Sequence, residues 1–448
     1  MSLSMRDQIQ NVSDKGVSIR HWNVFLFAMA FTLRGGWSFI RAWQADFSPS
    51  LEFPDETQYW DMARSFWNGT GLRDELGFQA TRMPLYPVML SPFTTLEIGP
   101  LLVHILQAFM GAFTAVGTSA IARRFFGARV GILAGLFVCL DPFLVFFSSL
   151  MLTETAFIAA TVGFWWLLSK RWFSLTRLSH SSAATAAQKP LNLLFGIICG
   201  VVLSFGVYLR ESGLGMMLLA LFVGLASRRF QRPAVVAFAA AICVVILSLL
   251  PWAARNQVVL GEWCWLTTRA GISLYDGVRP GATGASNLGD VKQSSEVEGM
   301  SEADWNRHFL TESVRAIRSD PGRILWLAAI KASRTWNPFP NANEYRSPVI
   351  RFVAATWSLP LFLFAAVGAT LVWIWGGRNG RYALTLLLTP AVCLTLLHTL
   401  FVGSVRYRLA AIPMIAILSA CGVVAIFGSM VRREPAYMRG RHAPDDQT

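Results

Sequence analysis

Apolar residues along this chain gather in ten long runs that are separated by polar connections. A helix needs about 17 to 25 mostly apolar residues to cross the hydrocarbon of a bilayer. The runs fall at 22–43, 100–122, 130–150, 155–168, 191–209, 214–226, 233–252, 352–375, 382–402 and 409–430. Two of them, 155–168 and 214–226, are shorter than a full span. Each adjoins a polar segment, and such a segment can lie at membrane depth where it lines a water-filled cavity. The pattern predicts an all-α polytopic membrane protein with about ten transmembrane helices.

Two of the polar connections, 44–99 and 253–351, are long enough to hold structure of their own. Residues 54–71 carry apolar side chains at helical spacing, which predicts an interfacial helix with one apolar face. A second helical pattern covers 305–317. The apolar stretch 324–336 is too short to cross alone and is predicted to lie on the outer surface.

Composition supports the membrane class and narrows the list of partners. Of the 448 residues 54% are hydrophobic and 15% are charged, which is too apolar for a water-soluble globule. No internal repeat or soluble unit stands out, so one transmembrane domain is expected over 1–430, with a cytoplasmic tail at 431–448. The six cysteines form no disulfide or zinc pattern.

Lys and Arg alternate from one connection to the next, with clusters at 123–129 and 228–232. Because positive residues are retained in the cytoplasm, both chain ends are predicted to be cytoplasmic and the two long connections to face outward from an inner or plasma membrane. The net charge of +13 is spread over the inner connections instead of one soluble face, so no nucleic-acid partner is expected.

Three acidic residues lie at the predicted outer face. Asp55 and Glu56 open the 54–71 helix, and Glu154 follows the third apolar run. An ionisable group at membrane depth is costly and is retained for a partner or a function. Structural alternatives stay open, because acids favour a helix start and Thr153 could cap a helix that begins at Glu154.

Positive charge is disfavoured at the outer ends of the runs, so the basic residues predicted there indicate an anionic binding partner. Guanidinium groups bind phosphate oxygens in a bidentate geometry. For each arginine the alternative is contact with lipid headgroups or a nearby acid. Arg34 lies deeper, inside the first run, and is expected to pair with Asp141 or Glu154. The outer arginines are Arg82, Arg210, Arg255, Arg406 and Arg408.

Five motifs in order resemble the GT-C superfamily of integral membrane glycosyltransferases, in particular its polyprenyl-phosphate-dependent branch of protein O-mannosyltransferases and lipid A aminoarabinose transferases. The resemblance covers the whole chain, although the segment at Arg82 departs from the Lys-Pro-Pro usual in the aminoarabinose branch. The motifs are Pro54-Asp55-Glu56 with Tyr59, Arg82-x-Pro84-x-Tyr86-Pro87, Thr153-Glu154, Pro251-Trp252-x-x-Arg255-Asn256 and Arg406-Tyr407-Arg408-Leu409-x-x-x-Pro413.

The resemblance implies roles for these residues. Asp55 would act as general base or orient the acceptor, Glu56 lies beside it, and Glu154 matches a second acidic position. The outer arginines would bind the donor phosphate. Tyr59, Tyr86 and Tyr407 would position substrate. No cofactor is certain, and a divalent metal at Asp55 and Glu154 stays open because two carboxylates are too few ligands to argue for one.

The function expected from the resemblance is transfer of a sugar, hexosyl or pentosyl, from a polyprenyl-phosphate donor to a lipid, glycan or protein acceptor at the periplasmic or lumenal face, with inversion at the anomeric carbon. The alternative is a transporter or flippase for a lipid-linked or anionic solute, since Arg34 and Asp141 inside predicted spans would suit a translocation path. A scaffold without chemistry would leave the outer charges unexplained.

Overall fold

The computed structural model describes residues 19–44, 51–178, 185–227, 231–289 and 299–431, and within these ranges all regular structure is helical. The predicted all-α polytopic class is confirmed. Most of the predicted tail, 432–448, and the first 18 residues lie outside the described ranges.

Each of the ten predicted spans corresponds to one helix or a broken pair. Seven helices are long and apolar enough to cross a membrane, and α6 and α10 are shorter apolar helices. The elements that cover the ten runs are α2 (Ile19–Gln44), α5 (Gly99–Phe126), α6 (Ala128–Leu140) with α7 (Pro142–Phe147), α8 (Glu154–Leu178), α9 (Thr185–Leu209), α10 (Ser212–Ser227), α11 (Arg232–Leu260), α16 (Pro348–Trp375), α17 (Gly377–Leu400) and α18 (Ile412–Val431).

The third run is interrupted, where a single span was predicted over 130–150. Helix α6 ends before Asp141, whose carboxylate accepts a hydrogen bond from the Leu144 N–H at 2.9 Å and so caps α7. Pro142 has no N–H to donate to a continuing helix, which fixes the break.

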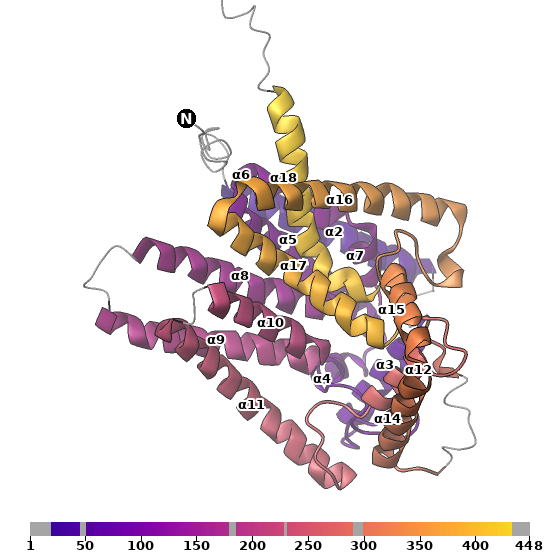
Figure 1. Cartoon of the computed structure of the whole chain (residues 1–448). Helices are drawn as coiled ribbons and strands as arrows, with labels where there is room; N and C mark the ends of the chain where they lie inside the picture. The colour runs from indigo at the N-terminus through magenta and orange to yellow at the C-terminus, as the bar shows by residue number, and fades with distance from the viewer. Residues whose placement is uncertain (1–18, 45–50, 179–184, 228–230, 290–298, 432–448) are drawn as a thin grey trace, which may run out of the picture.

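The two long connections fold into short helices at one end of the long ones (Figure 1). At 15 residues, α15 is too short to cross a bilayer, as predicted for 324–336. The connections hold α3 (Pro54–Trp67), α4 (Leu85–Leu90), the 3-10 turn η1 (Ser91–Phe93), α12 (Ala270–Val278), α14 (Glu302–Ser319), α15 (Pro321–Thr335) and the turn η4 (Asn343–Tyr345), and the turn η5 (Tyr407–Ala411) precedes α18.

The apolar face predicted for 54–71 is only partly buried. Tyr59, Met62 and Ala63 pack into the core, whereas Phe66 and Trp67 at the end of α3 are exposed. Helix α3 therefore docks onto the protein through its first half, the half that carries Asp55.

Glu302 joins the two outer connections. Its carboxylate, at the start of α14, accepts hydrogen bonds from the N–H groups of Gln79 at 2.6 Å and Ala80 at 2.8 Å, and from the Thr268 hydroxyl at 2.6 Å. The Thr268 N–H in turn donates to the Ala80 carbonyl at 3.0 Å. One buried carboxylate thus fixes the segments that carry Arg82 and Arg269.

The pairing expected for Arg34 is wrong. Its guanidinium donates to the backbone carbonyls of Ala30, Val138 and Cys139. A side chain at Gly111 would collide with it, because a Cβ there would lie 2.4 Å from Arg34 Nε. Arg34 thus satisfies the carbonyl groups that become free where α6 ends, which is a structural role.

Replacing Glu302 with alanine is expected to loosen the outer connections. Two backbone N–H groups and a hydroxyl would lose their acceptor, at about 1–3 kcal/mol for each group left unpaired in the interior. The Tm in detergent should fall, and proteolysis between residues 71 and 82 should accelerate. Glu312→Ala on the same helix is the control, because among the described residues Glu312 pairs only with the exposed Arg315. Equal behaviour of the two variants would contradict this role of Glu302.

Candidate active site

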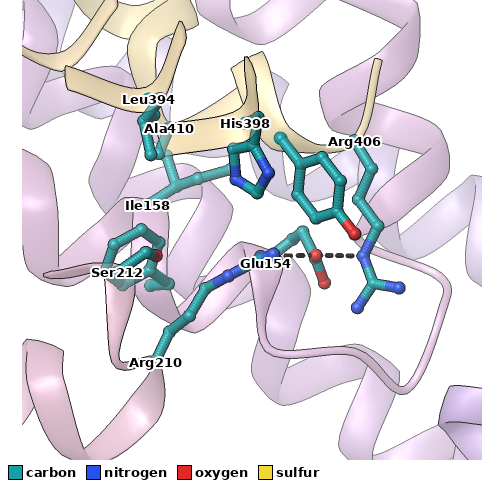
Figure 2. A pocket seen from close by; sticks show the side chains of 10 residues that line it. Glu154, Ile158, Arg210, Ser212, Leu394, His398, Arg406 and Ala410 are labelled. Carbon is teal, nitrogen blue, oxygen red and sulfur yellow. Dashed lines mark hydrogen bonds and ion pairs between the residues drawn. The ribbon is translucent and has the colours of Figure 1, made fainter. Parts of the chain in front are cut away.

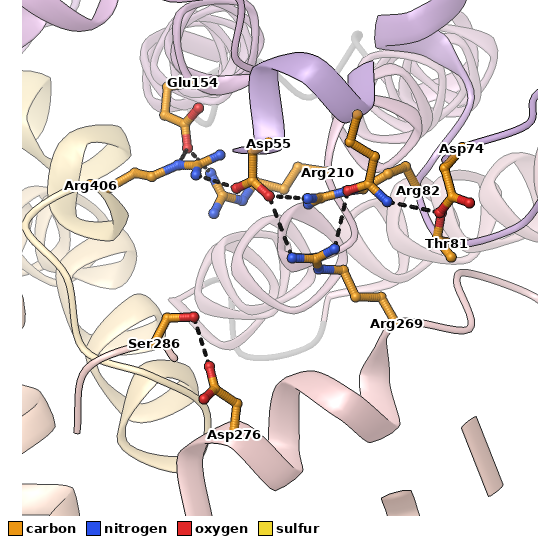
Figure 3. A network of polar contacts seen from close by, with 11 residues as sticks. Asp55, Asp74, Thr81, Arg82, Glu154, Arg210, Arg269, Asp276, Ser286 and Arg406 are labelled. Atoms are coloured by element: carbon orange, nitrogen blue, oxygen red, sulfur yellow. Dashed lines mark hydrogen bonds and ion pairs between the residues drawn. The ribbon is translucent and has the colours of Figure 1, made fainter. Parts of the chain in front are cut away.

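Asp55 lies among three guanidinium groups contributed by distant parts of the chain (Figure 3). Its Oδ1 accepts from Arg82 Nη2 and, at 3.4 Å, from Arg269 Nη2, while its Oδ2 accepts from Arg406 Nη1 at 2.5 Å. Asp55 is the second residue of α3, where the helix dipole also favours a negative charge.

Arg406 bridges the two predicted acids. While its Nη1 pairs with Asp55, its Nε donates to Glu154 Oε1, and that same oxygen accepts from Arg210 Nη1 at 2.7 Å. Glu154 begins α8, Arg210 follows α9, and Arg406 lies between α17 and α18. We call Asp55, Glu154, Arg82, Arg210, Arg269 and Arg406 the charged cluster.

The cluster carries more positive than negative charge, since two carboxylates face four guanidiniums. The arginine side chains are 12–17% exposed, Asp55 is 25% exposed and Glu154 is only 2% exposed. Arg210 makes no hydrogen bond to a described residue other than Glu154. The cluster therefore remains accessible and has donors to spare for an anionic ligand.

Burial alone would raise the pKa of Asp55, but Arg82, Arg406 and Arg269 outweigh it and hold the pKa well below the ordinary 3.8. The carboxylate is therefore charged at every physiological pH. The three guanidiniums that face it also disfavour a divalent cation, and no three His, Cys, Asp or Glu side chains converge as metal ligands within the described ranges. The residues at Asp55 and Glu154 do not fit the metal left open by the sequence.

Glu56, predicted beside Asp55 as a catalytic acid, points elsewhere. Its Oε1 accepts from the N–H groups of Glu52 at 3.1 Å and Phe53 at 3.2 Å, and its Oε2 accepts from the Met151 N–H at 2.7 Å. Glu56 is buried and holds the start of α3 against the turn that precedes Glu154. Both carboxylate oxygens of Glu56 are thus engaged by backbone N–H groups, and its catalytic role stays a prediction.

Tyr59 and Tyr86 are buried and pack beside the cluster, and their side chains are not exposed at its surface. The two rings meet edge to face at 5.1 Å, and the Arg82 guanidinium lies 4.9 Å above the Tyr59 ring. The Tyr86 hydroxyl donates to Gln107, whose amide donates to the Leu150 carbonyl at 2.7 Å. Tyr86 thus also fixes the turn before Glu154.

Tyr407 lies next to the cluster, beside Arg210 and His398. Its ring stacks on His398, with centroids 3.7 Å apart and planes within 7°, and the Arg210 guanidinium lies 5.2 Å from the Tyr407 centroid. Of the three predicted tyrosines, Tyr407 is the one that contacts an arginine bonded to Glu154.

Two of the arginines predicted to bind phosphate lie outside the cluster. Arg255 donates to Gln79 and stacks on Trp252 at 5.0 Å. Arg408 is buried between aromatic rings and donates to the backbone carbonyls of Thr335 and Asn337. Both side chains are occupied in contacts with backbone groups and aromatic rings.

Sequence reasoning missed Arg269 and Gln58. Arg269 is one of many arginines in the second outer connection, and no motif distinguishes it from the others. The Gln58 amide oxygen accepts from Arg82 at 2.9 Å and from Arg269 at 3.2 Å, and its amide nitrogen donates to Asp74. A signal for Gln58 existed, because it lies one helical turn after Asp55 on α3 and so shares its face.

Two small cavities flank the cluster, each of about 10 Å³. One is lined by residues of α8, α10 and α17 and includes Glu154, Arg210 and Arg406. The other lies among the outer connections, where Gln58, Asp74 and Arg269 face Trp305. The cluster therefore separates a pocket on the side of the long helices from one on the outer side.

Comparison with known proteins identifies the fold. Neither a protein-family model nor a curated protein matches this sequence. Among solved structures, the oligosaccharyltransferase AglB of Archaeoglobus fulgidus in complex with an inhibitory peptide and a dolichol-phosphate is similar over 96% of this chain, with a TM-score of 0.55 and 14% identity. The fold of this chain is therefore similar to that of the archaeal oligosaccharyltransferase.

The same oligosaccharyltransferase tethered to an acceptor peptide with the NVT sequon matches with a TM-score of 0.55 and 13% identity, over 96% of this chain and 52% of that one. This chain thus spans about half the length of the archaeal enzyme. ArnT of Cupriavidus metallidurans bound to undecaprenyl phosphate is similar over 91% of this chain and 79% of that one, with a TM-score of 0.43 and 13% identity. The resemblance drawn from the motifs is confirmed for the fold.

The depressed pKa of Asp55 leads to a test by pH. A carboxylate with a lowered folded-state pKa contributes stability that is present above its unfolded pKa, near 3.8, and is lost as the pH falls through the folded value. We expect Asp55→Asn to lower the Tm in detergent by the same amount at pH 5, 6.5 and 8. A difference that shrinks toward pH 5 would show that Asp55 titrates in this range.

Proposed function

We propose that this protein is a glycosyltransferase that moves a sugar from a polyprenyl-phosphate donor to an acceptor at the outer face of the membrane. The observation that carries the proposal is the charged cluster, in which an excess of guanidinium groups surrounds two carboxylates at the outer ends of the helices. The shared fold with AglB, whose structure contains a dolichol-phosphate, supports it.

The arginines would bind the phosphate of the donor and stabilise it as the leaving group. When the bond between the anomeric carbon and the phosphate oxygen breaks, the polyprenyl phosphate gains a second negative charge. The excess of two positive charges in the cluster matches this product. Charge stabilisation by pre-placed cations in a partly desolvated site lowers the barrier of such a step.

Asp55 would receive the proton of the acceptor. With three arginines around it the carboxylate is a weak base, but a donor phosphate that competes for Arg82 and Arg269 would weaken their hold and raise the pKa of Asp55. The base would thus become active only when the donor is bound. A carboxylate on the face opposite the leaving group permits direct displacement, so we expect inversion at the anomeric carbon.

Chain topology supports a site on the outer side of the membrane. The cluster residues lie in connections that all emerge at the same end of the helices, after α2, α7, α9, α11 and α17. The alternate connections hold Arg123, Arg124 and Arg129, which favour the cytoplasm. We infer an outward site in an inner or plasma membrane, with both chain ends in the cytoplasm. The sugar, the hexosyl or pentosyl class and the lipid, glycan or protein acceptor belong to the proposal as alternatives.

A transporter or flippase is less well supported, because the two charged residues inside spans that suggested a translocation path both have structural partners. Arg34 is bonded to backbone carbonyls, and Asp141 caps α7 and accepts from the Trp357 indole at 2.9 Å. Neither residue lines one of the two cavities.

Asp55→Asn is expected to lower sugar transfer by at least about 100-fold, the lower range for loss of a general base. The variant keeps the shape of the side chain and removes a negative charge from among three arginines, so binding of undecaprenyl phosphate should be equal or tighter. Transfer is measured with radiolabelled lipid-linked sugar in proteoliposomes. Full transfer by the variant would exclude Asp55 from the chemistry.

Arg269→Ala is expected to weaken binding of undecaprenyl phosphate by about 10-fold or more, which is the range for one charge-assisted hydrogen bond. The matched control is Arg307→Ala in the same outer connection, because Arg307 is 59% exposed and pairs only with Glu262 and Asp304 among the described residues. Native mass spectrometry measures both affinities. Equal losses in the two variants would show a general charge effect instead of a site.

A further inference from the structure

The cavity on the side of the long helices lies directly behind the pair formed by Glu154 and Arg406 (Figure 2). Ser212 at the start of α10 and His398 near the end of α17 also line it, and Leu394 belongs to its apolar wall. Its volume of about 10 Å³ is close to the least that admits one water-sized group. We call it the Glu154 cavity.

Several polar atoms that line the Glu154 cavity are buried and unpaired. Glu154 Oε2, Ser212 Oγ and both ring nitrogens of His398 make no hydrogen bond to any described residue, although the Val402 carbonyl lies near the ring. Glu154 is 2% exposed and His398 is 7% exposed. Unpaired buried polar groups are rare because each is costly, so three side chains around one cavity indicate a missing polar ligand.

Charge restricts what this ligand can be. A cation would approach Arg210 and Arg406, and an anion would approach the free oxygen of Glu154, so neither is favoured. A neutral imidazole offers one donor and one acceptor, and the Ser212 hydroxyl can act as either. A neutral hydroxyl group can donate to the free oxygen of Glu154 while it accepts from Ser212 and from one ring nitrogen of His398.

We infer that the Glu154 cavity is a subsite for one hydroxyl group of the donor sugar. The inference rests on the proposed function. Arg210 and Arg406, which would hold the donor phosphate, also line the cavity, and the sugar ring is bonded directly to that phosphate. A ring hydroxyl therefore lies within reach when the phosphate is bound. Water is the other source of a neutral hydroxyl and occupies the cavity when no sugar is present.

The test compares lipids with and without a sugar. Native mass spectrometry of the full chain in detergent would measure the affinity for undecaprenyl phosphate and for undecaprenyl phosphate that carries mannose, glucose or 4-aminoarabinose. At least one of these sugars should improve binding over the bare lipid. In Ser212→Ala and His398→Phe this gain should fall by about 5- to 10-fold, the value of one or two hydrogen bonds, while affinity for the bare lipid should not change.

Matched controls come from residues that are also buried and unpaired but lie away from both cavities. Ser419→Ala and His104→Phe remove the same groups elsewhere and should keep the full sugar-dependent gain. Ser212→Ala removes a single oxygen atom, so it decides the matter even if His398→Phe does not fold.

The possible failures are distinguishable. A gain retained in Ser212→Ala overturns the subsite. A wild-type protein that binds the bare lipid but gains nothing from any of the sugars shows that the cavity holds water alone, and also overturns it. Absence of binding to undecaprenyl phosphate itself contradicts the proposed function instead.

Discussion

The site depends on one guanidinium, that of Arg406, which is shared between two carboxylates. Its Nε contacts Glu154 at the start of α8 and its Nη1 contacts Asp55 on α3. Only a planar group with several N–H donors can hold two acids in this way, which a lysine ammonium does not reproduce. Three parts of the fold, namely the first outer connection, the α7–α8 turn and the α17–α18 connection, are thereby fixed at one point.

Around this contact the fold divides the work between groups that hold the framework and the charged cluster itself. Glu56, Tyr86 and Glu302 bind backbone groups or other side chains of the framework and so place the segments that carry the cluster. The cluster itself keeps donors in excess and remains partly exposed. An excess of buried positive charge is costly for an empty site, which is consistent with a site shaped for an anion that arrives with its substrate.

The two cavities lie on different sides of the charged cluster. Apolar helices surround the Glu154 cavity, whereas the cavity at Gln58 and Asp74 lies among the outer connections. Under the proposed function, this separation would let a lipid-linked donor reach the cluster along the long helices and an acceptor reach it from the side of the two long connections.

Sequence pattern alone was enough to predict the helical class and the ten apolar segments, and to assign Asp55, Glu154 and Arg406 to the same end of the helices, because hydropathy and charge act locally and leave a direct record in the chain. It did not distinguish Arg269 from the other arginines of its connection, nor Arg408 and Glu56 from the members of the charged cluster. Those roles depend on which backbone carbonyl or N–H group lies opposite a side chain, and contacts such as that between Arg406 and Asp55 join residues 351 positions apart. Only the tertiary structure decides such pairings, since bidentate geometry and burial are properties of packed segments and not of local pattern.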